Sequence, residues 1–294
     1  ETFITEACEY TNSFLSFFPT MEIILNIEAD HLDFFKDLDD IRHSFRLFAE
    51  KLDEKGLLII NRDIKNYEEI SGGLPCRVVT FGHSKESDYS AADITYDAFA
   101  RPTFTLVEQG KAAGTITLGV PGEHNVYNAM AAAAVGLQLG LTIAEIKSGI
   151  EKAETIAGRT NFIKTHGMTV IDDCYNANPV SMKSSIEVLS HAKGRTIAVL
   201  GDMGELGSDE KKLHHEVGEA VGENHIHTLF AAGELAKEYA AGAAEKSPDV
   251  DIHYFEDRET MTQELLSYVK EGDTILVKAS HFMEFPKVVE ALGK

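Results

Sequence analysis

Two apolar segments of this sequence end abruptly in acidic, amide and glycine residues. The first, 169–182, reads TVIDDCYNANPVSM, and the second, 198–207, reads AVLGDMGELG. In α/β proteins a parallel strand buried on both faces is a continuous apolar run, and ligands bind beyond the carboxyl ends of such strands. Asn178 is a good helix N-cap and Pro179 suits a first helical turn, so a helix should follow directly. The sequence therefore predicts a ligand site at these strand ends.

The first of these segments offers several kinds of ligand-binding side chain. Asp172 and Asp173 are adjacent, and in an extended backbone only one of them faces the crevice. Tyr175, Asn176 and Asn178 add groups that can stack or form hydrogen bonds. A ligand site and a tight polar turn without a ligand are both compatible with this pattern.

The second segment and the last predicted strand add further polar groups. Glycines in Gly201–Gly207 allow a ligand to approach the backbone closely. The spacing is not G-x-G-x-x-G, and the acids, Asp202 among them, would repel phosphate, which excludes a dinucleotide fingerprint. Lys278, Ser280 and His281 follow an apolar run, and with their cationic and hydroxyl groups they suit an anionic substrate.

Carboxylates and an imidazole also gather near the start of the chain. We expect Glu6 to end one apolar strand and the cluster Glu28–Asp33, which includes His31, to end another. Two parallel strands could bring these groups into one crevice that holds Mg²⁺, an ion that prefers oxygen ligands. The alternative is that they are exposed loop acids, because E-x-D-H-x-D is not a specific motif.

Two amides are placed for base recognition. Asn125 and Asn128 lie three residues apart near the start of a predicted helix, on one face, where they can donate and accept hydrogen bonds together. Helix capping is the alternative for both. The histidine pairs 214/215 and 225/227 could suggest a metal site, but we interpret them as surface residues of helices.

The remaining pattern predicts two α/β domains, 1–157 and 158–294. In the first we expect strands at 21–27, 56–60 and 77–81, helices at 39–52, 125–139 and 143–152, and antiparallel strands between 93 and 120. In the second, strands at 196–200, 228–232, 251–255 and 274–277 alternate with helical stretches, which is the doubly wound pattern. Residues 240–249 are interpreted as a solvated loop or a frayed helix end.

Composition limits the class of protein. The formal net charge of −21 argues against nucleic acid or an anionic membrane as a partner, since both require basic patches. Three cysteines without C-x-x-C spacing favour a reduced, cytoplasmic setting. No stretch approaches 18 apolar residues, and no signal peptide is recognised.

Taken together, these segments resemble the Mur ligases, the ATP-dependent enzymes that add amino acids to the peptidoglycan precursor. Residues 1 to about 120 are similar to the branch that adds L-alanine to UDP-N-acetylmuramate, through TEACEY at 5–10 and NIEADHLD at 26–33. Residues from about 122 onward are similar to the branch that adds D-alanyl-D-alanine to the UDP-muramoyl-tripeptide, through Gly158-Arg159, 172–182, 200–207 and 276–280. The chain therefore resembles a hybrid of the two.

The resemblance implies a fold, a reaction and a set of roles. The fold would be a partial Mur ligase central ATPase domain followed by a Rossmann-like doubly wound C-terminal domain. ATP would phosphorylate a carboxylate of the UDP-N-acetylmuramoyl precursor, and the amine of alanine or D-alanyl-D-alanine would attack the acyl phosphate. The implied ligands of Mg²⁺ are Glu6 and His31; of the nucleotide, Asn125, Asn128, Arg159, Asp173 and Tyr175; of the incoming amino component, Asp202, Lys278 and Ser280.

Two family features do not occur in these residues. The P-loop, a Gly-Thr-x-Gly-Lys-Thr sequence, is absent, as is a UDP-binding amino-terminal domain. We therefore expect a truncated or hybrid chain that is inactive alone, with D-alanyl-D-alanine addition as the favoured parent activity. L-alanine addition is the alternative within the family, and a non-catalytic binding module is the alternative outside it.

Overall fold

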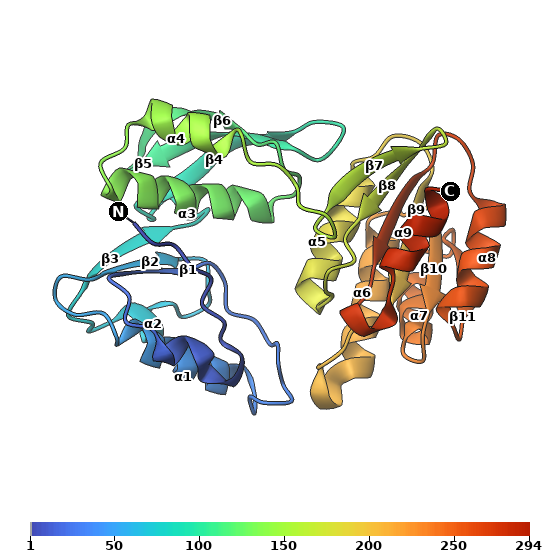
Figure 1. Ribbon diagram of the computed structural model, residues 1–294, viewed down its shortest axis with the longest axis horizontal. Coiled ribbons are helices and arrows are strands. Elements are labelled where there is room, and N and C mark those ends of the chain that lie inside the picture. Colours follow the sequence, from blue (N-terminus) through green and yellow to red (C-terminus); the bar gives the residue numbers. More distant parts are fainter. Residues whose placement is uncertain (1) are drawn as a thin grey trace. The chain divides into compact units, whose positions relative to one another are not determined.

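The computed structural model describes residues 2–294 and contains two compact units, each built on its own β-sheet (Figure 1). The first unit comprises the residues up to Thr95 together with Thr103–Leu118 and His124–Ala153. The second comprises Tyr96–Pro102, Gly119–Glu123 and Glu154–Lys294. The domain boundary predicted at residue 158 stays a prediction, since the second unit also takes in two short earlier segments.

Among the described residues, the sheet of the first unit has six strands in the order β1-β2-β3-β4-β5-β6. They are β1 (Met21–Ile24), β2 (Leu57–Asn61), β3 (Arg77–Phe81), β4 (Tyr89–Tyr96), β5 (Pro102–Glu108) and β6 (Lys111–Thr117). β2 pairs in parallel with β1 and β3 and is buried almost throughout, as its apolar sequence predicts. β5 and β6 form the predicted antiparallel pair; Gln109 and Gly110 turn the chain between them with φ of 46° and 78°.

Helices cover this sheet. They are the 3₁₀ helix η1 (Tyr10–Ser16) and the α-helices α1 (Leu38–Ala49), α2 (Glu68–Ser71), α3 (His124–Gln138) and α4 (Ile143–Ile150). α1 begins at Asp37, whose side chain accepts a hydrogen bond from the backbone N–H of Asp40. The alanine-rich α3 packs closely as predicted: a side chain added at Gly136 would come within 2.8 Å of Ile146 on α4.

The strand expected to end at Glu6 is not formed. Residues 2–9 contain no helix or strand, so this prediction is wrong. Phe3 and Ile4, its apolar residues, are 87% and 77% exposed. Because a strand needs a hydrogen-bonded neighbour and an apolar surface to cover, alternation of residue types alone does not create one.

The sheet of the second unit is doubly wound. Its strand order, over the described residues, is β11-β10-β9-β12-β8-β7. The strands are β7 (Asn161–Thr165), β8 (Met168–Asp172), β9 (Thr196–Gly201), β10 (Thr228–Ala232), β11 (Asp251–Phe255) and β12 (Thr274–Lys278). All neighbours pair in parallel except β7, which runs antiparallel to β8 at the edge. The predicted α/β fold class is confirmed.

Helices lie on both faces of this second sheet (Figure 1). They are α5 (Pro179–Ser190), α6 (Glu210–Glu223), α7 (Ala236–Lys246), α8 (Arg258–Tyr268) and α9 (Pro286–Leu292), with 3₁₀ turns η2 (Gly207–Asp209) and η3 (His281–Met283). Alternate residues of β9 pack into two hydrophobic clusters, one on each face of the sheet. Ala198 and Leu200 pack in the cluster with α5, α6 and α7, whereas Ile197 and Val199 pack in the cluster with α8 and α9.

Two interpretations of the second unit need correction. Of the two given for residues 240–249, the loop is wrong for residues 240–246, which are the end of α7, because Gly242 and Ala243 are small enough to pack against α6. His214 is fully buried: its Nε2 lies 2.9 Å from the backbone nitrogen of Met203, and its Nδ1 lies 2.7 Å from the carbonyl oxygen of Glu210. Helical residues of the described chain do not form an apolar stretch long enough to span a bilayer.

Candidate functional site

The turn after β8 is organised by one buried carboxylate. The Asp173 side chain accepts hydrogen bonds from the backbone N–H of Thr160 at 2.8 Å and from the Ser185 hydroxyl at 2.5 Å, and it pairs with the Lys278 ammonium at 2.7 Å. Burial alone would raise its pKa, but Lys278 and the hydrogen bonds outweigh burial and hold the pKa of Asp173 below its usual value. The carboxylate is therefore ionised and internally satisfied.

Two residues at the end of β12 hold the backbone of this turn. Lys278, which is buried, also donates from Nζ to the carbonyl oxygen of Asn176 at 3.0 Å. The Ser280 hydroxyl donates to the carbonyl oxygen of Ala177 at 3.3 Å and accepts from the backbone N–H of Gly204 at 2.8 Å. The strand ends of β8, β9 and β12 are thus linked through one set of hydrogen bonds.

The outer surface of the turn carries a stacked pair. The guanidinium of Arg159 lies over the ring of Tyr175, 4.2 Å from its centroid, and both residues are exposed. Gly158, with φ of +76°, donates from its backbone N–H to Asp172 and accepts from the backbone N–H of Tyr175. An exposed planar cation on an aromatic ring is a surface on which a planar ligand group can stack.

Asp202 lies at the end of β9 against the start of α7. Its Oδ2 accepts from the backbone N–H of Leu235 at 3.2 Å, and its Oδ1 has no hydrogen-bond partner among the described residues. Burial raises the pKa of Asp202, and the neighbouring backbone N–H groups offset only part of this rise. Gly233, with φ of +133°, leaves the space that this carboxylate occupies, because a side chain at position 233 would come within 2.3 Å of Asp202.

In the first unit, the two predicted amides do share a helical face. Asn128 Nδ2 donates to Asn125 Oδ1 at 3.0 Å on the first turns of α3. Asn125 Nδ2 also lies 3.1 Å from His124 Nε2. The two amides thus form a hydrogen bond with each other. This arrangement is compatible with both base recognition and helix capping.

The residues predicted to hold Mg²⁺ are also in the first unit. The His31 ring stacks on Tyr10 at 4.5 Å, and its Nε2 lies 3.7 Å from the Glu9 carboxylate. Glu6 is exposed, in the segment that forms no strand. Within the described residues of this unit, no three potential ligand side chains converge on one point. The donors are of the right chemistry for Mg²⁺, but this unit alone does not assemble them, so the metal site stays a prediction.

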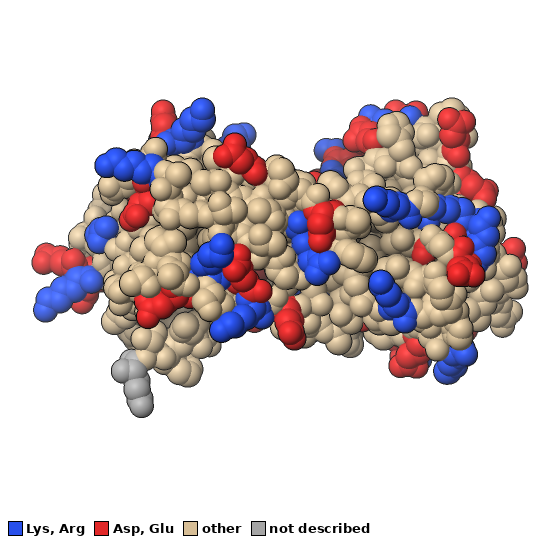
Figure 2. Space-filling model, turned by 90° about the horizontal axis from the view of Figure 1, so that it is seen from above, with Lys and Arg blue, Asp and Glu red and all other residues tan. Residues whose placement is uncertain are grey.

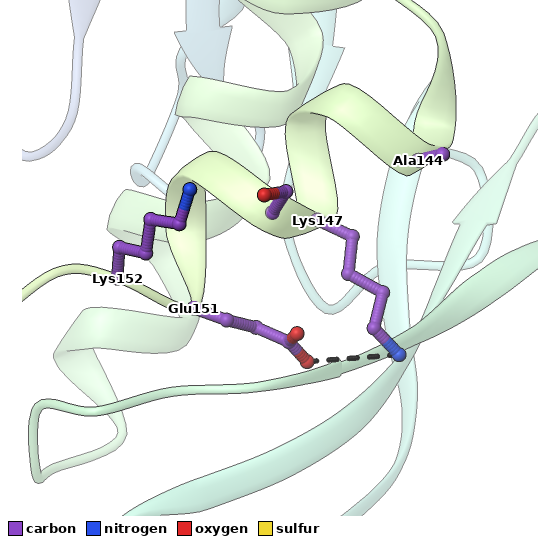
Figure 3. Close-up of a pocket in the computed structure, with 5 residues that line it drawn as sticks. Ala144, Lys147, Glu151 and Lys152 are labelled. Atoms are coloured by element: carbon purple, nitrogen blue, oxygen red, sulfur yellow. Dashed lines mark ion pairs between the residues drawn. The ribbon is translucent and has the colours of Figure 1, made fainter.

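The pocket along α4, the surface charges and Cys174 give no reason to place the candidate site away from the strand ends. The pocket drawn in Figure 3 lies along α4, where Lys147 and Glu151 form an ion pair of 3.6 Å, and no predicted site residue lines it. Acidic and basic residues are interspersed on the face shown in Figure 2. Cys174 is buried and its pKa is raised by burial, so it is not poised as a nucleophile.

The sequence did not predict which residues donate hydrogen bonds to the Asp173 carboxylate. Thr160 and Ser185 carry no motif, and their role follows only from the fold. The contact between Gly204 and Ser280 joins two loops that are 76 residues apart in the chain. A missed feature of the first unit is Glu22 on β1: the side chain is 2% exposed, and neither carboxylate oxygen has a hydrogen-bond partner in the described residues.

The fold and the strand-end loops define a two-unit α/β protein of the ligand-binding, doubly wound class. Comparison with family models narrows this class. The Mur ligase middle domain matches residues 1–136, and the glutamate ligase domain of Mur ligases matches residues 158–281. The chain belongs to the Mur ligase family, as its sequence motifs predicted.

Individual relatives agree with this assignment. The UDP-N-acetylmuramate–L-alanine ligase of Lachnospira eligens is 52% identical over 191 residues, covering 64% of this chain and 41% of the relative. The enzyme of the same name from Caldanaerobacter subterraneus is 33% identical over 297 residues, covering 94% of this chain and 61% of the relative. The chain thus spans roughly half the length of the curated relatives it matches.

Solved structures of the family have the same fold. The MurF ligase of Thermotoga maritima in complex with ADP is 25% identical, with a TM-score of 0.80, over 94% of this chain and 62% of that one. A D-alanyl-D-alanyl ligase acting on a UDP-N-acetylmuramoyl peptide, from Acinetobacter baumannii, is 27% identical, with a TM-score of 0.79, over 96% and 60%.

Proposed function

We propose that this chain is part of an ATP-dependent ligase that forms an amide bond on a UDP-N-acetylmuramoyl precursor of peptidoglycan. The observation that carries the proposal is that two Mur ligase models match most of the chain, the middle domain at residues 1–136 and the glutamate ligase domain at residues 158–281. ADP in one similar structure supports a nucleotide cofactor. We also assign the protein to the cytoplasm, which its three unpaired cysteines favour.

For the incoming amino component we propose L-alanine. The sequence motifs favoured D-alanyl-D-alanine, but the curated relatives described above are named as L-alanine ligases, and one of them matches 94% of this chain. D-alanyl-D-alanine remains the second candidate, because the similar solved structures include a D-alanyl-D-alanyl ligase. The two candidates share ATP, a UDP-linked acceptor and Mg²⁺, and they differ only in acceptor peptide and amine.

In the second unit we assign roles by whether each side chain is exposed to solvent or bonded within the chain. Arg159 and Tyr175 contact the nucleotide, since they form an exposed stacked surface. Asp173, Lys278 and Ser280 act on ligands mainly by holding the turn that carries Tyr175, because their polar atoms bond to other parts of the chain. Asp202 is proposed to lie near the incoming amino component.

In the first unit, Asn125 and Asn128 are proposed as further nucleotide contacts. Their amides lie on one face of α3 and can donate and accept hydrogen bonds. Glu6 and His31 are the proposed ligands of Mg²⁺. When bound, this ion would neutralise charge on the ATP phosphates.

An activity assay distinguishes the two amines. The protein is expressed together with any coding sequence that precedes residue 1 and is supplied with ATP and Mg²⁺. One reaction contains UDP-N-acetylmuramate and L-alanine, and the other contains the UDP-muramoyl-tripeptide and D-alanyl-D-alanine. We expect phosphate release and an amide product, identified by mass spectrometry, in the first reaction only. Product in the second reaction alone would assign the second candidate.

A binding assay tests the nucleotide surface. We expect Arg159→Ala and Tyr175→Ala to weaken ADP binding severalfold in calorimetry, because each removes half of the stacked pair. Lys193→Ala is the matched control, since Lys193 is an exposed cation of the same unit outside the turn. Unchanged ADP affinity in both turn variants would contradict the assignment.

A further inference from the structure

A cluster of metal-ligating side chains lies away from the strand ends, between α6 and α7 of the second unit. His215 and Glu219 project from α6, and Glu245 projects from α7. One potential ligand atom from each lies within 4.8 Å of the other two, and His215 Nε2 is 3.2 Å from Glu245. We propose that these three residues form a binding site for a first-row divalent cation of the zinc type.

The sequence places two of the ligands on one helical face. Residues four apart on a helix are neighbours, and the i, i+4 spacing is the one by which helices present a pair of metal ligands. An imidazole nitrogen with two carboxylates is a donor set that Zn²⁺ accepts, and three protein ligands leave a position for water. The site is thus of the open kind, accessible from solvent.

The packing of the two helices fixes the third ligand. A side chain at Gly242 on α7 would come within 2.1 Å of the carbonyl oxygen of His215, and one at Gly218 on α6 would come within 2.2 Å of that of Tyr239. Glycines therefore let the two backbones approach more closely than larger residues would allow. This rigid contact is next to His215, so Glu245 is held near the pair on α6 before any ion binds.

The charges around the cluster favour a cation but include one competitor. Glu219, Glu223 and Glu245 contribute three carboxylates, whereas Lys246 supplies one ammonium, 3.0 Å from Glu219 and 3.3 Å from Glu223. Lys246 can also bond to Glu223, so it can leave Glu219 when an ion binds. The side chains of His215 and Glu219 are 31% and 26% exposed, and that of Lys246 is 35% exposed.

The test is a direct measurement of Zn²⁺ affinity with the whole chain, by competition against a chromophoric chelator, and of the visible absorption of bound Co²⁺. His215→Ala and Glu245→Gln should each weaken Zn²⁺ binding about tenfold or more and reduce the Co²⁺ absorption. Both residues are on the surface, so the fold should be retained, which circular dichroism checks. His225→Ala is the matched control, because His225 is an exposed histidine of the same unit outside the cluster.

A fourth variant should strengthen Zn²⁺ binding instead of weakening it. Lys246→Gln removes the ammonium that competes for Glu219, so Zn²⁺ affinity should rise severalfold. The proposal is overturned if the wild-type chain binds no Zn²⁺, if His215→Ala and His225→Ala weaken binding equally, or if Lys246→Gln weakens it. None of these measurements depends on ligase activity, so they are independent of the proposed function.

Discussion

Each unit of the molecule buries a carboxylate beside its sheet, and the two carboxylates are treated in opposite ways. In the second unit Asp173 has a cation and two hydrogen-bond donors, and its pKa is lowered. In the first unit Glu22 has no hydrogen-bond partner in the described residues. Burial raises the pKa of Glu22 to about 8 and outweighs the opposing effect of Lys51. Burial alone thus does not decide the state of an acid; its partners do.

The same contrast extends to the surroundings of the two residues. Asp173 directly follows β8, an interior strand, and its partners come from Thr160 before β7, from Ser185 on α5 and from Lys278 at the end of β12. Glu22 is in β1, an edge strand of the first sheet, with its side chain on the same face as the core residue Ile24. On the opposite face of β1, Ile23 is 41% exposed. Packing around β1 of the first unit is therefore less complete than packing around Asp173 in the second unit.

The largest effect should come from breaking the pair in the second unit. Lys278→Met leaves the buried Asp173 carboxylate without its cation, which we expect to cost about 3–5 kcal/mol of unfolding free energy. Denaturant unfolding monitored by hydrogen exchange in β8 and β12 measures this. Lys287→Met is the control, because the Lys287–Glu284 pair is about half exposed and screened by solvent, so its loss should change stability far less.

A second substitution would make that result more specific. Asp173→Asn added to Lys278→Met removes the unpaired charge, so the double variant should recover part of the lost stability. If the double variant were less stable than Lys278→Met by the full effect of a second independent loss, the ion pair would not be the cause.

The first unit should respond to pH in the opposite sense. Because the pKa of Glu22 is raised from 4.5 to about 8 on folding, the folded state keeps a proton that the unfolded state has lost. Stability should therefore fall between about pH 4.5 and pH 8 and then level off. Glu22→Gln mimics the protonated side chain, so it should remove this decline and stabilise the first unit at pH 9 by several kcal/mol.

The control for this prediction is Glu54→Gln, an exposed acid of the same unit. The Glu54→Gln protein should lose stability between about pH 4.5 and pH 8 just as the wild type does. Hydrogen exchange in β1 and β2 at pH 5 and pH 9 reports the difference. If Glu22→Gln lost stability at pH 9, the side chain would be using its charge, and the comparison with Asp173 would no longer hold.

A smaller effect is expected at the helix that follows Asp173. The Asn178 side chain accepts a hydrogen bond from the backbone N–H of Ser181, and the Ser181 hydroxyl oxygen accepts one from the backbone N–H of Asn178. Asn178→Ala should therefore cost about 1 kcal/mol, measured by thermal unfolding. Ser190→Ala, at the exposed far end of α5, is the control and should change stability by less than about half that amount.

Much of the fold could be predicted from the sequence because the second unit follows local rules closely. The predicted strands 196–200 and 228–232 agree with β9 and β10 within one residue, since both are apolar runs bounded by polar residues. The cap at Asn178 was also predicted correctly. The strand predicted to end at Glu6 is not formed, because a strand depends on its neighbours. The sequence left residues 240–249 open between a loop and a helix end, because the close packing of Gly242 against α6 is a tertiary contact that helix propensity does not contain.

The candidate site was predicted only at the level of its location. The residue types at the ends of β8, β9 and β12 indicated a cluster, and the fold brings Asp173, Lys278 and Ser280 together. Which of them point inward could not be predicted. Lys278 was interpreted as a group for an anionic substrate, yet its ammonium bonds to Asp173 and to a carbonyl oxygen, because long-range partners decide orientation.

The three cysteines of this chain differ in a way that is useful to an experimenter. Cys76 and Cys174 are buried and their pKa values are raised, whereas Cys8 is exposed. A thiol-reactive fluorophore at neutral pH should therefore attach to Cys8 alone, without replacing any residue. Since Cys8 precedes Tyr10, whose ring stacks on His31, the dye would report events beside the predicted metal ligands in an otherwise unaltered molecule.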